Sequence, residues 1–136
     1  MIILKEEKQS GNLQIITIST VFMDLSRNTV VLVIDIQNDY CSDEGKFAKS
    51  GDNAEWAQKA ANDIIQFINE VRKIGIPIYH MGRSVRAEDI SDFERKRNER
   101  MGVGLYCEEN AWGSEFYKIQ PIEDEQVILK KYYSCL

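Results

Sequence analysis

The sequence contains little of what builds metal sites, disulfide frameworks or membrane spans. Its single histidine, His80, excludes a zinc site built on several histidines, and the three cysteines form no C-x-x-C pair that could replace them. No run approaches the roughly 18 to 20 apolar residues that a membrane-spanning helix needs. An odd, sparse cysteine set is also not a disulfide framework, which favours a reducing compartment and predicts a cytoplasmic protein.

Basic charge is scarce as well. The formal net charge is -5 and the isoelectric point is about 5.0, which disfavours non-specific binding to nucleic acid or to an anionic membrane. The 136 residues suffice for one domain with a core, and their composition, 43% apolar and 29% charged, is ordinary for a globular protein.

Strand and helix signals alternate along the middle of the chain. The continuous apolar run "VVLVI" (30–34) is typical of a parallel strand with both faces covered. A helix is expected over residues 54–74 and a second strand over 76–82, which is the spacing of a right-handed βαβ unit. "VILK" (127–130) gives a third short strand. The pattern predicts an α/β fold with a parallel sheet.

The expected helix has a start signal and a buried stripe. Asp52 can cap it, with Glu55 three residues later as a capping-box partner. Its apolar stripe consists of Ala57, Ala60, Ile64, Ile68 and Val71, with Phe67 beside it.

The remaining segments are polar or irregular. Residues 1–23 are expected to form an N-terminal arm or edge strand, because 13–20 is rich in β-branched residues. Residues 41–53 indicate a loop, and 92–102 a solvated helix or lid. The glycines and aromatics of 102–117 suit a loop that forms a pocket wall.

Two charged residues stand where strands end. Asp35 directly follows the first strand and Lys130 ends the third, and ligands of parallel sheets bind at these carboxyl ends. Each could instead be the first residue to reach solvent, and Asp35 could cap a following helix. A dinucleotide site is disfavoured, because no G-x-G-x-x-G follows the strand.

Two segments resemble a known family. "TVVLVIDIQNDYC" is similar to the first-strand motif of the isochorismatase-like cysteine hydrolases, and "NAWGSEFYKIQPIEDEQVILKKYYSCL" is similar to the segment that leads to their catalytic lysine. The resemblance runs from about Asp24 to Leu136. It implies a three-layer αβα fold and a Cys-Asp-Lys triad in which Asp35 and Lys130 are the catalytic acid and lysine. The implied reaction is hydrolysis of a C–N bond in a small amide, ureide or carbamate, without a cofactor.

The nucleophile of that triad has no counterpart here. In the family it follows a further strand beyond the lysine, so Cys41 and Cys135 do not match it, and the cysteines are expected to be structural thiols. Residues 24–136 are therefore expected to be the N-terminal half of the hydrolase domain, truncated after the third core strand and inactive alone. The alternatives are a non-catalytic remnant or interaction module, and a vinyl ether hydrolase of the isochorismatase type.

Three further residues are candidates for substrate binding. Arg83, after the second strand, could bind a substrate carboxylate, or could be a surface arginine. Trp112 could line the pocket or pack as a core or lid aromatic. Tyr133 matches the family pattern after the lysine.

The resemblance also indicates which branch of the family this sequence matches better. Nicotinamidases bind a metal through an Asp-x-His pair, and "HMGRSVRAEDISDF" after the second strand contains none, so no metal is expected. "AWGSEF" and "LKKYYS" are closer to the ureido and carbamoyl amidohydrolases. Because a neighbouring subunit contributes to substrate selection in the family, the full domain is expected to form a homo-oligomer.

Overall fold

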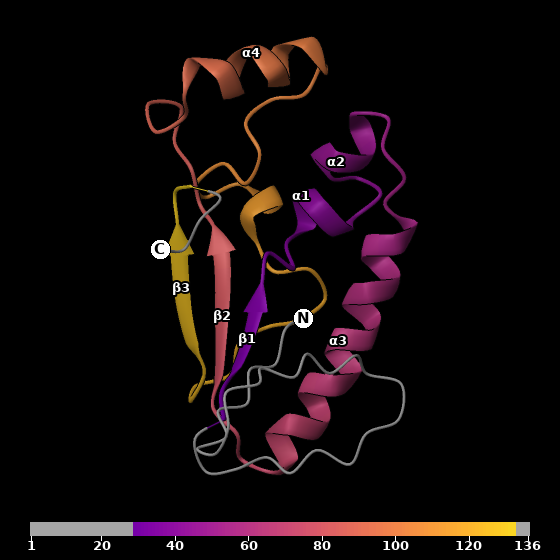
Figure 1. The fold of residues 1–136 in the computed structure, drawn as a ribbon, viewed down its shortest axis with the longest axis vertical. Coiled ribbons are helices and arrows are strands. Elements are labelled where there is room, and N and C mark those ends of the chain that lie inside the picture. Colours follow the sequence, from indigo (N-terminus) through magenta and orange to yellow (C-terminus); the bar gives the residue numbers. More distant parts are fainter. Residues whose placement is uncertain (1–28, 133–136) are drawn as a thin grey trace, which may run out of the picture.

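A three-stranded parallel sheet forms the centre of the computed structural model, which describes residues 29–132 (Figure 1). Its strands are β1 (Val31–Ile34), β2 (Ile78–Arg83) and β3 (Gln126–Lys130), in the order β1-β2-β3. Both pairings are parallel, which confirms the predicted α/β fold. The predicted arm at 1–23, Tyr133 and Cys135 lie outside the described residues.

One long helix connects β1 to β2 and covers one face of the sheet. This is α3 (Glu55–Lys73), close to the predicted 54–74. Its buried residues pack against Val31 and Val33 of β1. They are Ala57, Ala61, Ile68 and Val71.

Two details of the helix differ from the sequence prediction. Ala61 is buried in place of Ala60, because Ala60 faces an open cleft. The first-turn N–H of Glu55 donates to the side chain of Asn53 (2.8 Å), whereas Asp52 accepts from the Ser50 hydroxyl instead. The N-cap residue is Ala54, which makes no side-chain cap hydrogen bond, so the capping box predicted from Asp52 does not form.

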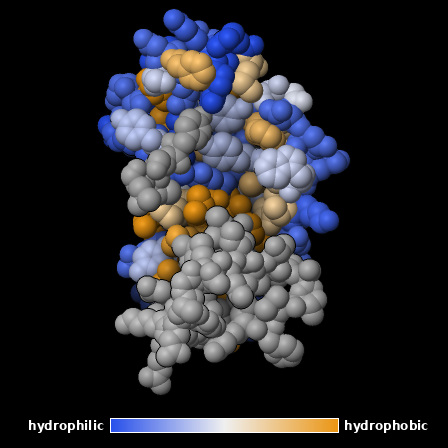
Figure 2. Space-filling model, viewed as in Figure 1, coloured by the Kyte–Doolittle hydropathy of each residue, from blue (hydrophilic) through white to orange (hydrophobic). Residues whose placement is uncertain are grey.

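The opposite face of the sheet is largely uncovered within residues 29–132. Strand register places Leu32, Ile34 and Ile128 on this face, and all three are exposed. Apolar surface is visible over the middle of the molecule in Figure 2. The expectation that both faces of β1 are buried is therefore not met by the described residues, among which β1 also has no second partner strand.

Short helical elements gather beyond the carboxyl ends of the strands (Figure 1). They are α1 (Asn38–Cys41), α2 (Lys46–Lys49) and the 3-10 turn η1 (Trp112–Ser114). The sequence predicted a loop without helices over 41–53, whereas the structure has the short helix α2 in this segment. The predicted polar helix is α4 (Asp92–Arg100), the outermost element in this direction. No helix in the described part of the chain is long and apolar enough to cross a membrane.

Gln37 extends the pairing of β1 and β2 beyond the end of β1. The backbone N–H of Arg83 donates to Gln37 Oε1 (2.7 Å), and Gln37 Nε2 donates back to the Arg83 carbonyl (2.8 Å). The same Nε2 donates to the carbonyl of Ser114 (2.6 Å), which ties η1 to the sheet. The side chain is fully buried, so these bonds have no competition from water.

We expect Gln37→Glu to lower the free energy of unfolding by about 2 kcal/mol or more. The variant keeps the size of the side chain but turns the donor toward the Arg83 and Ser114 carbonyls into a buried acceptor. Urea denaturation of both proteins measures the change. Gln66→Glu, at an exposed position of α3, is the control and should stay within about 0.5 kcal/mol. Equal effects of the two substitutions would contradict this role for Gln37.

A second buried network holds the start of β3 against α3 and β2. Glu125 accepts from Arg72 of α3 (2.7 Å to Nε) and lies 2.7 Å from His80 Nε2 of β2. The hydrogen bond from Arg72 is the main reason that the pKa of Glu125 falls to about 2. His80 is fully buried and also packs edge-on against Phe116. It is thus a core histidine.

Glu125 should make stability depend on pH at the acid end. Since its folded-state pKa lies below the ordinary 4.5, its contribution is complete above pH 4.5 and is lost as the pH falls toward 2. We expect Glu125→Gln to lower the free energy of unfolding by roughly 2 kcal/mol at pH 7, and the difference from wild type to shrink steadily below pH 4.5. Denaturant titrations at several pH values measure this.

The exposed Glu70, which pairs with Lys73 on the surface, supplies the control. Glu70→Gln should change stability little at any pH. A pH-independent loss in Glu125→Gln would show that its contacts matter through packing and not through charge.

Candidate active site

The acid that follows β1 and the lysine that ends β3 meet at the carboxyl end of the sheet. Lys130 Nζ donates to Asp35 Oδ2 at 2.8 Å. The lysine side chain is 7% exposed and the aspartate side chain 31%, so the pair is partly shielded from water. The strands that carry them are not neighbours, and β2 lies between them. The ion pair therefore spans the sheet.

The second oxygen of Asp35 is free to accept a proton. Oδ1 is buried and has no hydrogen-bond partner among the described residues. The backbone at Asp35 has a φ of 57°, a left-handed conformation that is unusual outside glycine. Backbone strain of this kind clusters at functional sites and persists where the surroundings impose it. Here the hydrogen bond from Asp35 N to the Met81 carbonyl (2.8 Å) fixes the residue against β2.

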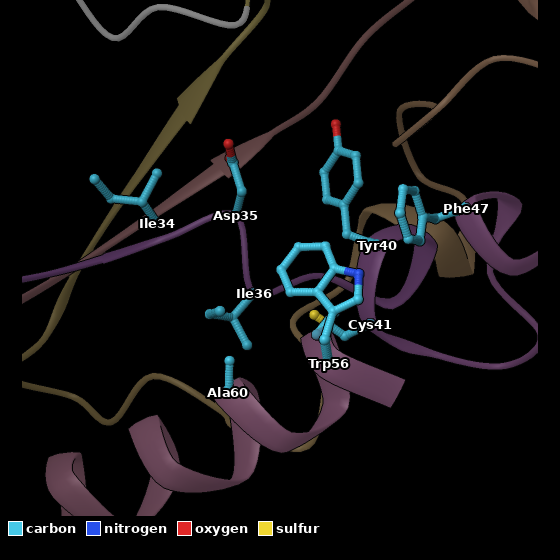
Figure 3. A pocket seen from close by; sticks show the side chains of 9 residues that line it. Ile34, Asp35, Ile36, Tyr40, Cys41, Phe47, Trp56 and Ala60 are labelled. Atoms are coloured by element: carbon cyan, nitrogen blue, oxygen red, sulfur yellow. The ribbon is translucent and has the colours of Figure 1, made fainter. Parts of the chain in front are cut away.

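A cleft of about 320 Å³ opens beside Asp35, between the end of β1 and the first turns of α3 (Figure 3). Its walls are mostly apolar and aromatic. The lining residues are Ile34, Asp35, Ile36, Tyr40, Cys41, Phe47, Trp56, Ala57 and Ala60. A single carboxylate in such a cavity is the general form of a small-molecule site.

The polar residues after Asp35 bind the backbone and side chains of the surrounding loops. Asn38 Nδ2 donates to the carbonyl of Trp112 (2.8 Å). The buried carboxylate of Asp39 accepts from the ammonium group of Lys46 (3.0 Å) and from the backbone N–H of Cys107 (2.7 Å). A Cβ on Gly113 would lie 2.3 Å from this carboxylate, so only glycine fits there without displacing it.

The structure describes two of the three predicted binding residues, and these two lie in different surroundings. Arg83 is buried, so the alternative of a surface arginine is wrong, and its guanidinium donates to Glu94 of α4 (2.7 Å). Trp112 is half exposed and does not line the cleft beside Asp35. Tyr133 lies outside the described residues. Their roles in binding remain predictions.

Sequence reasoning missed two aromatic residues of the cleft, Phe47 and Trp56. Their rings meet edge to face, with centroids 6.1 Å apart. Trp56 is 66% exposed, which is unusual for so large an apolar side chain. The sequence feature that could have identified Trp56 was its position on the helix. It stands one residue before the buried Ala57 and therefore lies off the core stripe.

Neither described cysteine has the properties of a reactive thiolate. Cys41 and Cys107 are buried and unpaired. Loss of solvation raises the pKa of Cys41 to about 11 and that of Cys107 to about 12. Both are therefore neutral thiols near pH 7, and a neutral thiol is a poor nucleophile.

Residues 29–132 also contain no group of three histidine, cysteine, aspartate or glutamate side chains that could hold a metal ion together.

Several solved structures have a fold similar to that of this chain. They include a pyrazinamidase of Pyrococcus horikoshii in complex with zinc (22% identity, TM-score 0.54) and an isochorismatase-like hydrolase from Alkaliphilus metalliredigens (22%, 0.51). A cysteine hydrolase from Pseudomonas syringae pv. phaseolicola 1448A is a third (17%, 0.53). They align with 75%, 74% and 77% of this chain, which spans 51%, 50% and 47% of theirs. These likenesses establish the fold.

A comparison with curated proteins gave no match. The model of the isochorismatase domain matches residues 29–136, which include β1, α3, β2, β3 and both members of the ion pair. The chain therefore belongs to the isochorismatase domain family.

Proposed function

We propose that the protein is a hydrolase that cleaves the C–N bond of a small amide, ureide or carbamate, with Asp35 and Lys130 as two members of a Cys-Asp-Lys triad. The carboxylate of Asp35 carries the proposal. One of its oxygens is bound to Lys130, and the other is buried and without a hydrogen-bond partner among the described residues. A carboxylate held in this way can take up a proton without first losing another bond.

In this mechanism the thiol transfers its proton to Asp35, and the thiolate adds to the carbonyl carbon of the substrate. The ammonium group of Lys130, 2.8 Å away, lies against the carboxylate of Asp35 and balances its charge before the transfer. Asp35 then passes the proton to the leaving nitrogen, and ammonia or an amine departs from an acyl-enzyme. Water hydrolyses the thioester, which releases the acid and restores the thiol.

The thiol itself is assigned to polypeptide outside residues 29–132. Cys41 and Cys107 are buried, and their pKa values are raised to about 11 and 12, so neither suits nucleophilic attack. The described part of the chain would then contribute the proton-transfer pair and one wall of the cleft, and would not turn over substrate alone. The homo-oligomer, the cytoplasmic location and the ureido and carbamoyl branch belong to the same proposal.

A non-catalytic interaction module is the second candidate. The observation that favours it is the uncovered apolar face of the sheet, which includes Leu32, Ile34 and Ile128. Exposed apolar area of this kind marks interaction surfaces as well as incomplete domains. The two functions differ in whether Asp35 and Lys130 affect turnover.

We expect Asp35→Asn and Lys130→Ala each to lower kcat/KM at least about hundredfold, because the first removes the proton acceptor and the second leaves it without its counter-ion. The protein measured is the natural gene product that contains residues 1–136. The measurement is ammonia release from ureidoacrylate, biuret and N-carbamoyl amino acids.

Lys131→Ala is the matched control. This neighbouring lysine is 56% exposed and pairs with Asp89 at the surface, so its loss should leave kcat/KM within about twofold. Turnover that survives in Asp35→Asn would refute the proposed roles. Absence of turnover with every substrate, in a protein that binds another protein, would favour the interaction module.

A further inference from the structure

The end of β3 is bound by two hydrogen bonds from the end of β2. Arg83 lies opposite Lys130 in the parallel register, and the backbone N–H of Ser84 donates to the Lys130 carbonyl (2.9 Å). The side chain of Arg83 extends one residue further, because its Nε donates to the carbonyl of Lys131 (3.2 Å). Two successive carbonyls are therefore fixed where the Lys130 side chain leaves the strand.

Arg83 and Lys130 are two cations that need separate counter-ions. Paired residues of neighbouring strands project from the same face of a sheet, and both of these residues are buried. Like charges at this spacing repel each other strongly where water is scarce. Asp35 pairs with Lys130 (2.8 Å), and Glu94 accepts from the Arg83 guanidinium (2.7 Å). The place of Lys130 beside Asp35 thus depends on an anion for Arg83.

The start of α4 aims the carboxylate of Glu94 at Arg83. The backbone N–H of Glu94 donates to the hydroxyl of Ser91, the N-cap residue (3.2 Å). A serine followed three residues later by glutamate is a capping-box sequence, in which the glutamate side chain usually turns back to the N-cap N–H. Here the Oε1 atom of Glu94 accepts from Arg83, which joins the first turn of α4 to the end of β2.

Polar side chains are what α4 buries. Its buried residues are Glu94 and Asn98, whereas Phe93 is 72% exposed. Removing one partner of a buried ion pair leaves the other charge uncompensated, which has a larger effect than the loss of an exposed pair. A change of charge at Glu94 therefore acts on Arg83 and on the end of β3.

From these contacts we infer that Glu94 is a positioning residue for Lys130 and acts through Arg83. Glu94 binds the guanidinium group, and the guanidinium group binds the Lys131 carbonyl. The end of β3, fixed in this way, presents the ammonium group of Lys130 to Asp35. The inference rests on the proposed catalytic role of Lys130 and extends the candidate site to α4.

Hydrogen exchange tests this series of contacts without turnover. Glu94→Gln keeps the size of the side chain and an acceptor oxygen, and it removes the charge. In the natural gene product that contains residues 1–136, we expect it to speed exchange of the Ser84 N–H at least about fivefold, because the bond to the Lys130 carbonyl opens more often. The measurement is amide exchange followed by NMR.

A second amide and a second variant are the controls. The Val31 N–H, which donates to the Pro77 carbonyl at the start of β1, should exchange in Glu94→Gln as it does in wild type. Glu99→Gln, at an exposed position of α4, should change the exchange of neither amide. Equal acceleration at Ser84 and Val31 would indicate a general loss of stability. That result, or no acceleration at Ser84, would overturn the inference.

Kinetics separate positioning from substrate binding. With the substrates named above, Glu94→Gln should lower kcat about tenfold and leave KM within about twofold, because Lys130 acts on Asp35 in the reacting complex. In an Arg83→Met background, the same substitution should change kcat no more than about twofold, since the link to β3 is already lost. Circular dichroism confirms that each variant is folded. An equal loss of kcat in both backgrounds, or a rise in KM in place of the loss, would contradict the inference.

The two measurements distinguish this inference from the proposed function. Faster exchange at Ser84 alone, with no turnover of any substrate, would refute the proposed function and retain the structural link. Turnover that depends on Lys130 but not on Glu94 would refute the inference and retain the function.

Discussion

The ion pair between Lys130 and Asp35 is the constraint on which the candidate site depends. It joins residues 95 positions apart, across a sheet in which β2 separates the two strands that carry them. The pair forms only when both parallel pairings are in register, with Arg83 of β2 opposite Lys130. The geometry of the candidate site is thus a direct product of the sheet, and the hydrogen bond from Asp35 N to the Met81 carbonyl of β2 fixes Asp35 in its left-handed backbone conformation.

Much of this could be predicted from the sequence, for definite reasons. The apolar run of β1 and the length of α3 indicate an α/β fold. Because the carboxyl ends of parallel strands lie at one edge of a sheet, the sequence also predicts that Asp35 and Lys130 lie close together. The cleft could not be predicted in the same way. Trp56 lies off the core stripe of α3, which is the ordinary pattern of a surface residue, and only the tertiary arrangement brings Phe47 to it. The burial of Arg83 likewise depends on Glu94, which belongs to a helix that looked fully solvated.

The site combines two environments that meet at Asp35. On the sheet side the carboxylate is bound by Lys130, with Gln37 holding the adjacent backbone through a fully buried amide. On the cleft side it faces aromatic and aliphatic side chains of the described part of the chain. The proposed proton transfer would take place in the first environment, and a ligand in the cleft would meet the second.

The register of the sheet also has a kinetic consequence. Val31 pairs with Ile78 and Tyr79 pairs with Gln126, so each contact that starts a pairing closes a separation of 47 residues (78 − 31 and 126 − 79). A fold whose central contacts are all this distant must lose much chain entropy before those contacts begin to stabilise it, and it collapses slowly. During that interval the four apolar residues of β1 are unprotected, and other nascent chains compete with β2 for them. The time for which β1 stays exposed is then set by how fast α3 forms and brings β2 alongside β1.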